Sequence, residues 1–175
     1  MKRVLIIGGN GAGKSTMAKE LAEITSLPLC HLDGLYWLDG WVPRPRDEFD
    51  LLLTAELEKS EWILDGIFRR TLPRRLEYCD TVVYLDYSGI RCFFGVLRRI
   101  LTYRGRTRSD MGGECIECFD SRSLKFLFGT LTFNRKNRAY LYGCVKEHPE
   151  VRLVVLKNRR QLRRWLDEVR REYGK

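Results

Sequence analysis

Short apolar runs alternate with amphipathic stretches along the chain of 175 residues. The runs are rich in Val, Ile and Leu and end near glycine or aspartate, a pattern typical of buried strands. The stretches between them place apolar residues three or four positions apart, which indicates helices. The pattern predicts strands over residues 3–8, 29–32, 62–64, 81–85 and 151–156, and helices over residues 14–26, 45–59, 90–103, 121–147 and 162–173.

This alternation predicts the fold class. Strands that are joined through helices pair in parallel, so we expect an α/β fold with a five-stranded parallel sheet and helices on both faces. The length favours one domain over residues 1–175, without linker or repeat. Residues 35–42 are expected to form an aromatic loop. The polar stretch 104–120 has no apolar period and is a candidate arginine-rich lid, because a long loop inside a compact domain usually has a function.

The composition, 44% apolar and 31% charged, is that of an ordinary globular protein. The longest nearly apolar stretch, residues 126–133, is far shorter than the roughly 20 residues that span a bilayer. The apolar run after Met1 is too short for a signal peptide. We therefore expect a cytoplasmic protein with no membrane partner. Thiols stay reduced there, so the following cysteines are interpreted as small buried apolar residues: Cys30, Cys79, Cys92 and Cys144.

The net charge of +9 is divided unevenly between the halves of the chain. Residues 1–88 carry 11 basic and 14 acidic side chains, and residues 89–175 carry 21 and 9, which gives −3 and +12. Of the 32 basic residues 23 are Arg, whose planar guanidinium matches phosphate oxygens. This favours a ligand with phosphate groups, either a nucleotide or a polymer.

Residues 8–15 read Gly-Gly-Asn-Gly-Ala-Gly-Lys-Ser, which fits the phosphate-binding loop (P-loop) pattern. The motif follows a predicted strand and opens a predicted helix, which is the context that it requires. An ordinary glycine turn would need neither the lysine nor the hydroxyl. We expect the nucleotide to be bound by Gly8, Gly9, Asn10, Gly11, Ala12, Gly13, Lys14, Ser15 and Thr16.

Three residues of the motif have individual expected roles. Lys14 would reach the β- and γ-phosphates, Ser15 would hold Mg²⁺, and Thr16 would lie near the α-phosphate. The chain lacks the Asn-Lys-x-Asp motif of guanine-binding proteins and the Leu-Ser-Gly-Gly signature of transporter ATPases. We therefore expect a small phosphotransferase that uses ATP and Mg²⁺.

Three aspartates follow predicted strands, at the sheet edge where open α/β proteins bind their ligands. Asp33 and Asp65 come after the second and third strands, and Asp86 follows the fourth. We expect Asp33 to accept the proton of an attacking hydroxyl and Asp65 to hold Mg²⁺. Asp86 is interpreted as a strand terminator. His31 shares a strand face with Asp33 and is either a core histidine or a hydrogen-bonding group of the site.

Arginines of the second half are candidate phosphate clamps. Arg104, Arg106 and Arg108 alternate in the candidate lid and would project together, while Arg135 and Arg138 share a helix face. Such cations stabilise charge that develops during phosphoryl transfer, and we assign a catalytic role to all of these except Arg106. The alternative is a solvated basic surface. Solvation is the favoured interpretation for Arg159, Arg160, Arg163, Arg164, Arg170 and Arg171.

Two other groups of residues carry weaker signals. Cys115 and Cys118 form a Cys-x-x-Cys in the lid, but a structural zinc site needs four ligands and only distant Cys144 and His148 could add to them. Metal binding there is disfavoured. An aromatic cluster either stacks on a planar base or sugar or caps the helix that follows. Its members are Tyr36, Trp37 and Trp41.

Further motifs accompany the P-loop: residues 31–37 (His-Leu-Asp-Gly-Leu-Tyr-Trp), 40–42 (Gly-Trp-Val), 62–66 (Trp-Ile-Leu-Asp-Gly) and 103–108 (Tyr-Arg-Gly-Arg-Thr-Arg). Together they resemble the bacterial topology modulation protein family, over residues 1 to about 157. The resemblance implies an adenylate-kinase-like P-loop kinase with a three-layer P-loop NTPase fold. It also implies a sheet ordered 2-3-1-4-5, an acceptor site near Asp33, and a lid over residues 104–120.

The leading expectation is an ATP- and Mg²⁺-dependent kinase for a small, nucleoside- or nucleotide-like acceptor. The alternative is a nucleic-acid-associated ATPase or regulator of DNA topology, which the basic second half and the family name favour. No helix-turn-helix or zinc-finger pattern supports that alternative. Nucleotide sensing without turnover is a third interpretation. The sequence leaves the acceptor and the oligomeric state open.

Overall fold

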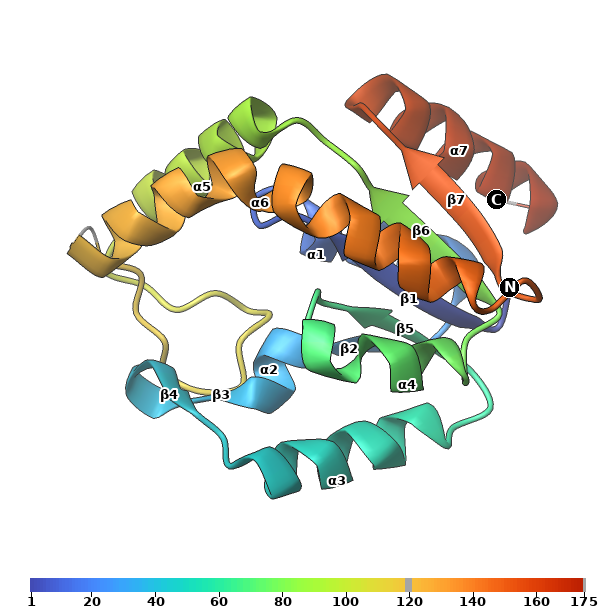
Figure 1. Cartoon of the computed structure of the whole chain (residues 1–175), viewed down its shortest axis with the longest axis horizontal. Coiled ribbons are helices and arrows are strands. Elements are labelled where there is room, and N and C mark those ends of the chain that lie inside the picture. Colours follow the sequence, from blue (N-terminus) through green and yellow to red (C-terminus); the bar gives the residue numbers. More distant parts are fainter. Residues whose placement is uncertain (119–120, 175) are drawn as a thin grey trace.

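A five-stranded parallel sheet forms the centre of the protein (Figure 1). The structure, a computed structural model, describes residues 1–118 and 121–174. The strand order is β2-β5-β1-β6-β7, which is 2-3-1-4-5 when the strands of this sheet are counted along the chain, so the predicted order is confirmed. The strands are β1 (Arg3–Gly8), β2 (Leu29–His31), β5 (Trp62–Asp65), β6 (Thr81–Leu85) and β7 (Arg152–Leu156).

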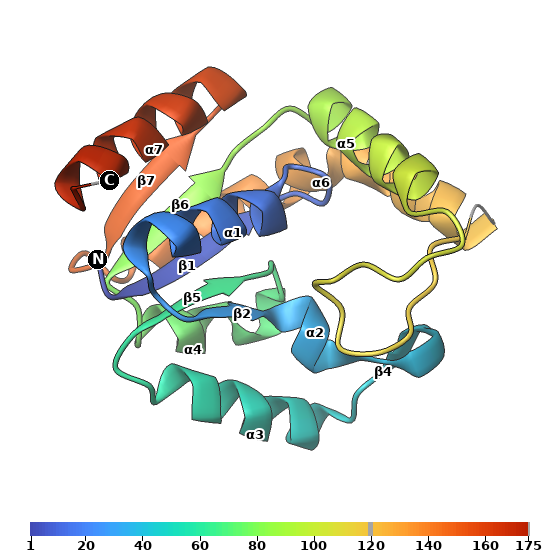
Figure 2. The same ribbon diagram turned by 180° about the vertical axis from the view of Figure 1, so that it is seen from behind.

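Helices cover both faces of this sheet, which confirms the predicted three-layer α/β fold (Figures 1 and 2). Helices α1 and α7 pack on one face, and α3, α4 and α6 pack on the other. Helix α5 packs along α6 rather than on the sheet. The bounds are α1 (Lys14–Thr25), α3 (Arg46–Leu57), α4 (Leu72–Leu76), α5 (Gly89–Thr102), α6 (Ser121–Lys146) and α7 (Arg159–Glu172).

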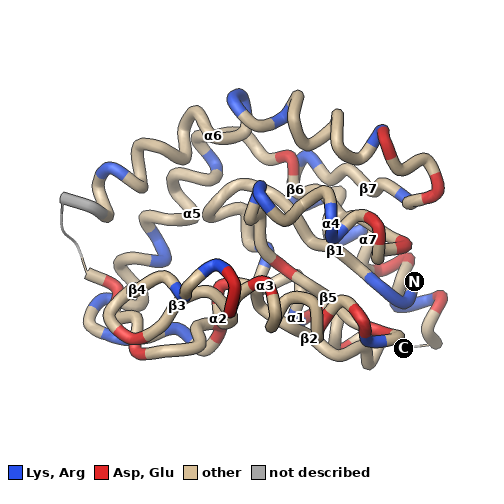
Figure 3. The backbone as a smooth tube through the Cα atoms, turned by 60° about the horizontal axis from the view of Figure 1, so that its bottom comes forward, with Lys and Arg blue, Asp and Glu red and all other residues tan. Residues whose placement is uncertain are grey.

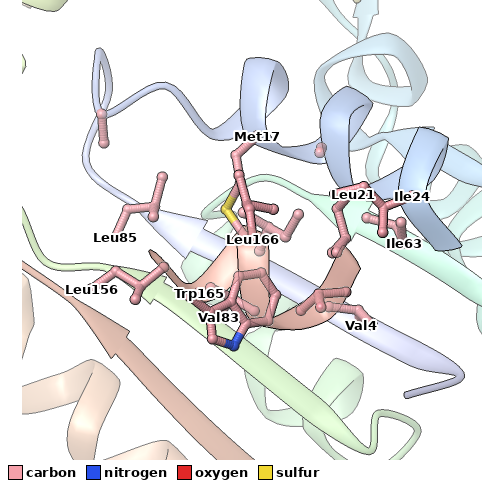
Figure 4. Close-up of a cluster of buried hydrophobic side chains, with 14 of the residues drawn as sticks. Val4, Met17, Leu21, Ile24, Ile63, Val83, Leu85, Leu156, Trp165 and Leu166 are labelled. Atoms are coloured by element: carbon pink, nitrogen blue, oxygen red, sulfur yellow. The ribbon is translucent and has the colours of Figure 1, made fainter. Parts of the chain in front are cut away.

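The central strand β1 supplies both hydrophobic cores, because neighbouring side chains of a strand point to opposite faces. Val4 and Ile6 join a cluster with α1 and α7, which includes Trp165 and is shown in Figure 4. Leu5 and Ile7 join the cluster on the other face, with α3, α4 and α6. A strand that is buried on both faces reads as a continuous apolar run. This explains why the pattern located β1 without showing an alternation.

The segment between β2 and α3 differs from the predicted aromatic loop. Strand β2 ends at His31, and α2 (Leu32–Tyr36) follows at once. A small antiparallel ribbon comes next, made of β3 (Trp37–Leu38) and β4 (Val42–Pro43) with a 3₁₀ turn at Asp39–Trp41. The cause is tertiary packing, since the Tyr36 ring contacts the rings of Trp37, Phe49 and Phe68. A second 3₁₀ turn, Arg69–Thr71, precedes α4.

Across the described part of the chain, every helix is too short or too polar to cross a bilayer.

Two glycines bring α5 into backbone contact with the P-loop. A Cβ atom at Gly95 would overlap the carbonyl oxygen of Gly11, and a Cβ at Gly11, whose φ is +80°, would overlap Cys92. Gly129 of α6 has open space at the same position. The backbones of α5 and the P-loop can therefore approach this closely because neither glycine has a side chain.

We expect Gly95→Ala to lower the free energy of unfolding by about 1–3 kcal/mol, because the added methyl group forces α5 away from the P-loop. The matched variant Gly129→Ala should instead add about 0.5–1 kcal/mol, since alanine is the better helix former and meets no neighbour. Urea denaturation measures both values. Equal shifts of the two midpoints would show that the close contact has no energetic weight.

Candidate active site

The P-loop connects β1 to α1 and leaves the first turn of α1 open to a ligand. Gly13 is the N-cap residue, with φ +92°, and no side chain caps the helix there. Gly11 and Gly13 both adopt the left-handed region that favours glycine. The uncapped N–H groups and the positive end of the helix dipole form an anion site. The predicted P-loop thus has the backbone geometry that phosphate binding requires.

A cleft of about 980 Å³ opens over this loop. Its walls come from residues 10–16 of the P-loop, from α5, from the lid segment around Arg108, and from α7. Asp33 and Asp65 lie at its inner end. The carboxyl ends of the parallel strands, the P-loop and the lid therefore meet at one site.

Lys14 lies half-buried in this cleft, where its Nζ donates to the carbonyl oxygen of Gly9 at 3.3 Å. Burial lowers the pKa of the ammonium, while the carboxylates of Asp33 and Asp65 act in the opposite direction. A desolvated cation interacts strongly with an incoming anion. The position therefore suits binding of a phosphate tail.

Asp33 lies in the first turn of α2 rather than directly after a strand as predicted, because β2 ends two residues earlier. Burial raises the pKa of its carboxyl group, and Lys14 and Arg108 partly oppose that effect. A carboxylate with a raised pKa is a better proton acceptor than an ordinary one. Asp33 is thus placed in the same cleft as Lys14.

Asp65 ends β5 and is engaged by His31. The Nδ1 atom of His31 lies 2.6 Å from Oδ1 of Asp65, and both side chains are largely buried. The contact gives His31 a hydrogen-bond partner that lines the cleft, and it is compatible with both interpretations of this residue. Asp65 also lines the cleft in which the magnesium ion is expected.

The lid segment 103–118 folds back onto the P-loop and onto the 34–41 segment. The Lys19 ammonium donates to Ser109 Oγ at 2.8 Å, and the backbone of Gly112 lies against that of Gly34. The N–H of Gly40 donates to the carbonyl oxygen of Glu114 at 2.9 Å. Residues 119 and 120 of the predicted lid lie outside the described residues. The described part of the lid thus forms one side of the cleft.

Asp110 of the lid is a site residue that the sequence pattern did not identify. It is buried, forms an ion pair with Arg108 at 2.8 Å, and lies close to the hydroxyl of Ser15. Burial alone would raise the pKa of Asp110, but Arg108 and Ser15 outweigh it and lower the pKa. Its only sequence signal is an acidic residue two positions after an arginine in a basic loop.

The predicted lid arginines do not project together. Arg104 and Arg106 are exposed, and their backbone atoms pair with Glu117 at the base of the lid. Arg108 is largely buried, because Glu117 holds it at 3.2 Å and holds Arg99 of α5 at 3.0 Å. The loop is irregular rather than extended, so alternate residues do not share a side. Arg108 lines the cleft, and Arg99 joins it.

The two predicted arginines of α6 lie away from the cleft. Arg138 pairs with Asp86 at 2.9 Å, and Arg135 is exposed. Asp86 is buried and is therefore an ion-pair partner as well as the residue that ends β6. Helix α6 contributes Asn134 instead, whose amide donates to the carbonyl oxygen of Tyr87 and whose Oδ1 lies beside Gly9.

Three arginines of α7 that were interpreted as solvated line the cleft. They are Arg159, Arg163 and Arg170. Arg170 also pairs with Glu20 of α1 at 2.5 Å, which joins the two helices beside the P-loop. The pattern located the helix correctly but not its rotation, so it could not show that this side faces the nucleotide position.

The donor set fits a magnesium ion that is held with few protein ligands. Among residues 1–118 and 121–174 no three His, Cys, Asp or Glu residues form a metal cluster. Mg²⁺ in phosphoryl-transfer sites takes one or two carboxylates together with waters and substrate phosphates. The Ser15 hydroxyl beside Asp110, with Asp65 in the same cleft, is such an oxygen set.

The remaining candidates lie apart from the cleft. Cys115 is buried with its thiol near the carbonyl oxygen of Leu38, whereas Cys118 is exposed. Trp41 packs against Trp37, and its indole N–H donates to the carbonyl oxygen of Ile116. These aromatic rings therefore support the lid rather than line the nucleotide cleft.

We expect Arg108→Ala to lower the rate of phosphoryl transfer on the order of 10²-fold, because it removes a fixed cation beside Asp33. Arg104→Ala should leave the rate within a few-fold, since that side chain points to solvent. Arg108→Lys should restore the rate only in part, because an ammonium lacks the planar fork. Steady-state rates of ADP formation measure all three. A larger loss with Arg104→Ala would reverse the assignment.

The fold and the site together define a P-loop nucleotide-binding architecture, and comparisons with known proteins agree with the fold. No family model matches the chain. A shikimate kinase of Parabacteroides distasonis is 32% identical over 94 residues, which is 54% of this chain and 49% of that protein. The chain thus aligns with about half the length of this curated relative.

Two solved structures extend the likeness over the whole chain. A shikimate kinase from Bacteroides thetaiotaomicron has a TM-score of 0.56 at 14% identity, with 99% of each chain covered. A shikimate kinase from Acinetobacter baumannii, in complex with shikimate, has a TM-score of 0.60 at 16% identity, with 97% of this chain and 90% of that chain covered. At this identity the likeness shows that the chain shares the fold of these two proteins.

Proposed function

We propose that the protein is an ATP-dependent kinase that transfers the γ-phosphoryl group to a hydroxyl group of a small molecule. The observation that carries this proposal is the meeting of Lys14, Asp33 and Arg108 in one cleft over the open N-terminus of α1. A site that only sensed nucleotide would need no half-buried carboxylate in the cleft that holds Lys14. The named activity of the relatives supports the same reaction class.

The geometry suggests a role for each group. The acceptor oxygen attacks the γ-phosphorus while the bond to the β,γ-bridging oxygen breaks, and Asp33 takes the hydroxyl proton. Lys14 and Arg108 stabilise the charge on the phosphoryl oxygens, and the backbone N–H groups of residues 11–16 hold the phosphate tail. Ser15, Asp110 and Asp65 would hold Mg²⁺, which neutralises phosphate charge when it is bound.

The acceptor is proposed as a small polar molecule with a free hydroxyl group. The sequence favours a nucleoside- or nucleotide-like molecule through its resemblance to topology modulation proteins. Shikimate is the second candidate acceptor, because the similar proteins are named shikimate kinases. Either acceptor would bind near the lid, which is anchored on the segment that carries Asp33.

An acceptor screen tests this proposal. ADP formation is measured with MgATP and panels of nucleosides, nucleoside monophosphates, shikimate and other small hydroxy acids. We expect one panel to accelerate ADP formation and to yield a phosphorylated product by mass spectrometry. If calorimetry shows MgATP binding but no panel accelerates turnover, the protein is a nucleotide sensor and the kinase proposal is wrong.

The nucleic-acid alternative has a weaker basis in the structure. Part of the positive charge of the second half faces the nucleotide cleft through Arg159, Arg163 and Arg170. If that alternative holds, duplex DNA binds and the affinity falls steeply with salt, by about 0.9 in the logarithmic slope for each neutralised phosphate. Absence of duplex binding at low salt would exclude it.

A further inference from the structure

Helices α5 and α6 present an apolar face on the outside of the molecule. Among the residues whose burial the structure describes, twelve large apolar side chains are exposed, and seven of them belong to these two helices. Phe94 is 61% exposed and Phe128 is 59% exposed, and both continue the partly buried ring of Phe93. We call this surface the α5–α6 face and define it by Ile90, Phe94, Leu97, Leu101, Leu124, Phe128 and Leu131.

The spacing of these residues is that of helix–helix packing. Residues 90, 94, 97 and 101 of α5 and residues 124, 128 and 131 of α6 follow steps of four and three. Such steps form the seam of packed helices. A seam is already buried on the inner side of both helices, where Val96, Ile100 and Leu127 form a separate core cluster. The residues of the α5–α6 face therefore form a second row of this kind, which we call the outer seam.

A hollow of about 360 Å³ lies on the outer seam of α5. Phe94, Leu97, Arg98 and Leu101 line it, with Thr102 at its edge. Residues at i, i+3, i+4 and i+7 are the four that form a hole for the side chain of a facing helix. The spacing of these residues therefore matches the packing of a facing helix.

We propose that this face binds a second copy of the same chain, so that two α5–α6 pairs form a four-helix bundle across a two-fold axis. A two-fold contact uses one surface twice, and this surface supplies both the hole on α5 and exposed Phe and Leu side chains to fill it. From the exposed fractions the face offers roughly 600 Å² per copy, against roughly 800 Å² per partner in a standard interface.

The charges around the face give the dimer a distinctive salt response. Neither α5 nor α6 contains an acidic residue, and together they carry nine basic ones (Figure 3). Arg99 and Arg138 are neutralised by Glu117 and Asp86, but Lys125, Arg135 and Lys136 are exposed. Two copies meet with like charges at the rim, so added salt screens the repulsion and tightens the dimer. Binding to an anionic bilayer or to nucleic acid would weaken instead.

The dimer contact is also connected to the active site, because helix α5 takes part in both. One side of α5 carries the outer seam, and another side places Gly95 against the P-loop and Arg99 in the cleft. A partner that presses on the outer seam would keep α5 seated on the P-loop.

Sedimentation velocity at micromolar concentrations tests the proposal with the full chain. We expect the wild-type protein to sediment as a dimer that tightens when sodium chloride is added. Phe94→Glu should weaken the dimer at least about thirtyfold, as loss of a central interface residue does. Phe94→Leu should keep it. Leu51→Glu is the matched control, because Leu51 is an exposed residue of α3 far from the α5–α6 face. This variant should remain dimeric.

Three results would overturn the proposal. A wild-type monomer at tens of micromolar would do so, provided that circular dichroism shows a folded protein. A dimer that Phe94→Glu and Phe128→Glu both leave intact would place the contact elsewhere. Flotation of monomeric protein with phosphatidylglycerol vesicles at low salt, reversed by salt, would show that the occupant is an anionic bilayer.

Discussion

Replacing Lys14 by methionine is expected to lower the rate of phosphoryl transfer on the order of 10²–10³-fold and to weaken MgATP binding, because it removes the cation nearest the phosphate tail. Methionine is also unbranched and is only one atom shorter, but it lacks the ammonium group with its charge and its hydrogen-bond donors. Calorimetry gives the dissociation constant for MgATP, and ADP formation gives the rate. Lys59→Met, at an exposed position just after the end of α3 that pairs with Glu56, is the control and should change neither.

The same variant should not destabilise the protein in the absence of nucleotide. Burial lowers the pKa of Lys14, so between the lowered and the ordinary pKa the unfolded state binds more protons than the folded state. The charged lysine is thus a cost to folding at neutral pH, and an uncharged residue of similar size removes it. A thermal melt of Lys14→Met at or above the wild-type value is expected. A large drop in melting temperature together with lost activity would instead indicate a structural role.

The parts of the fold that rest on local pattern were predictable. Strand β6 lies at the predicted residues 81–85, and the P-loop joins a strand to a helix as its motif requires. Buried parallel strands are short apolar runs between turn residues, and the glycines of the P-loop are needed at positive φ. These features depend on residues that are near one another in sequence.

The parts that depend on long-range contacts were not predictable in this way. The Arg138 partner, Asp86, lies 52 positions away, and Asp110 reaches Ser15 only because the lid folds back onto α1. Which side of α7 faces the cleft is set by its packing on α1, and Arg170 lines the cleft although its helix face reads as solvated. A polar residue has no periodic signal that distinguishes a ligand from a solvated surface.

Asp33→Asn is expected to lower the turnover number on the order of 10²–10⁴-fold while the affinity for MgATP changes only a few-fold. The amide keeps the shape of the side chain but cannot accept the acceptor proton. A rate assay at saturating ATP and acceptor, together with calorimetry for MgATP, separates the two effects. Asp47→Asn, at an exposed position on α3, should leave both quantities unchanged.

The pH dependence provides an independent test of the role of Asp33. Burial raises the pKa of this carboxyl group, so the wild-type rate should fall as the pH drops through a value above that of an ordinary aspartate. The raised pKa also means that the folded state holds the proton more tightly than the unfolded state, so this group opposes folding increasingly as the pH rises. Asp33→Asn should therefore abolish the acidic limb of the rate profile and raise the stability of the nucleotide-free protein at neutral pH. An acidic limb that persists in the variant would assign the proton acceptor to another group in the cleft, of which the His31–Asp65 pair is the nearest candidate.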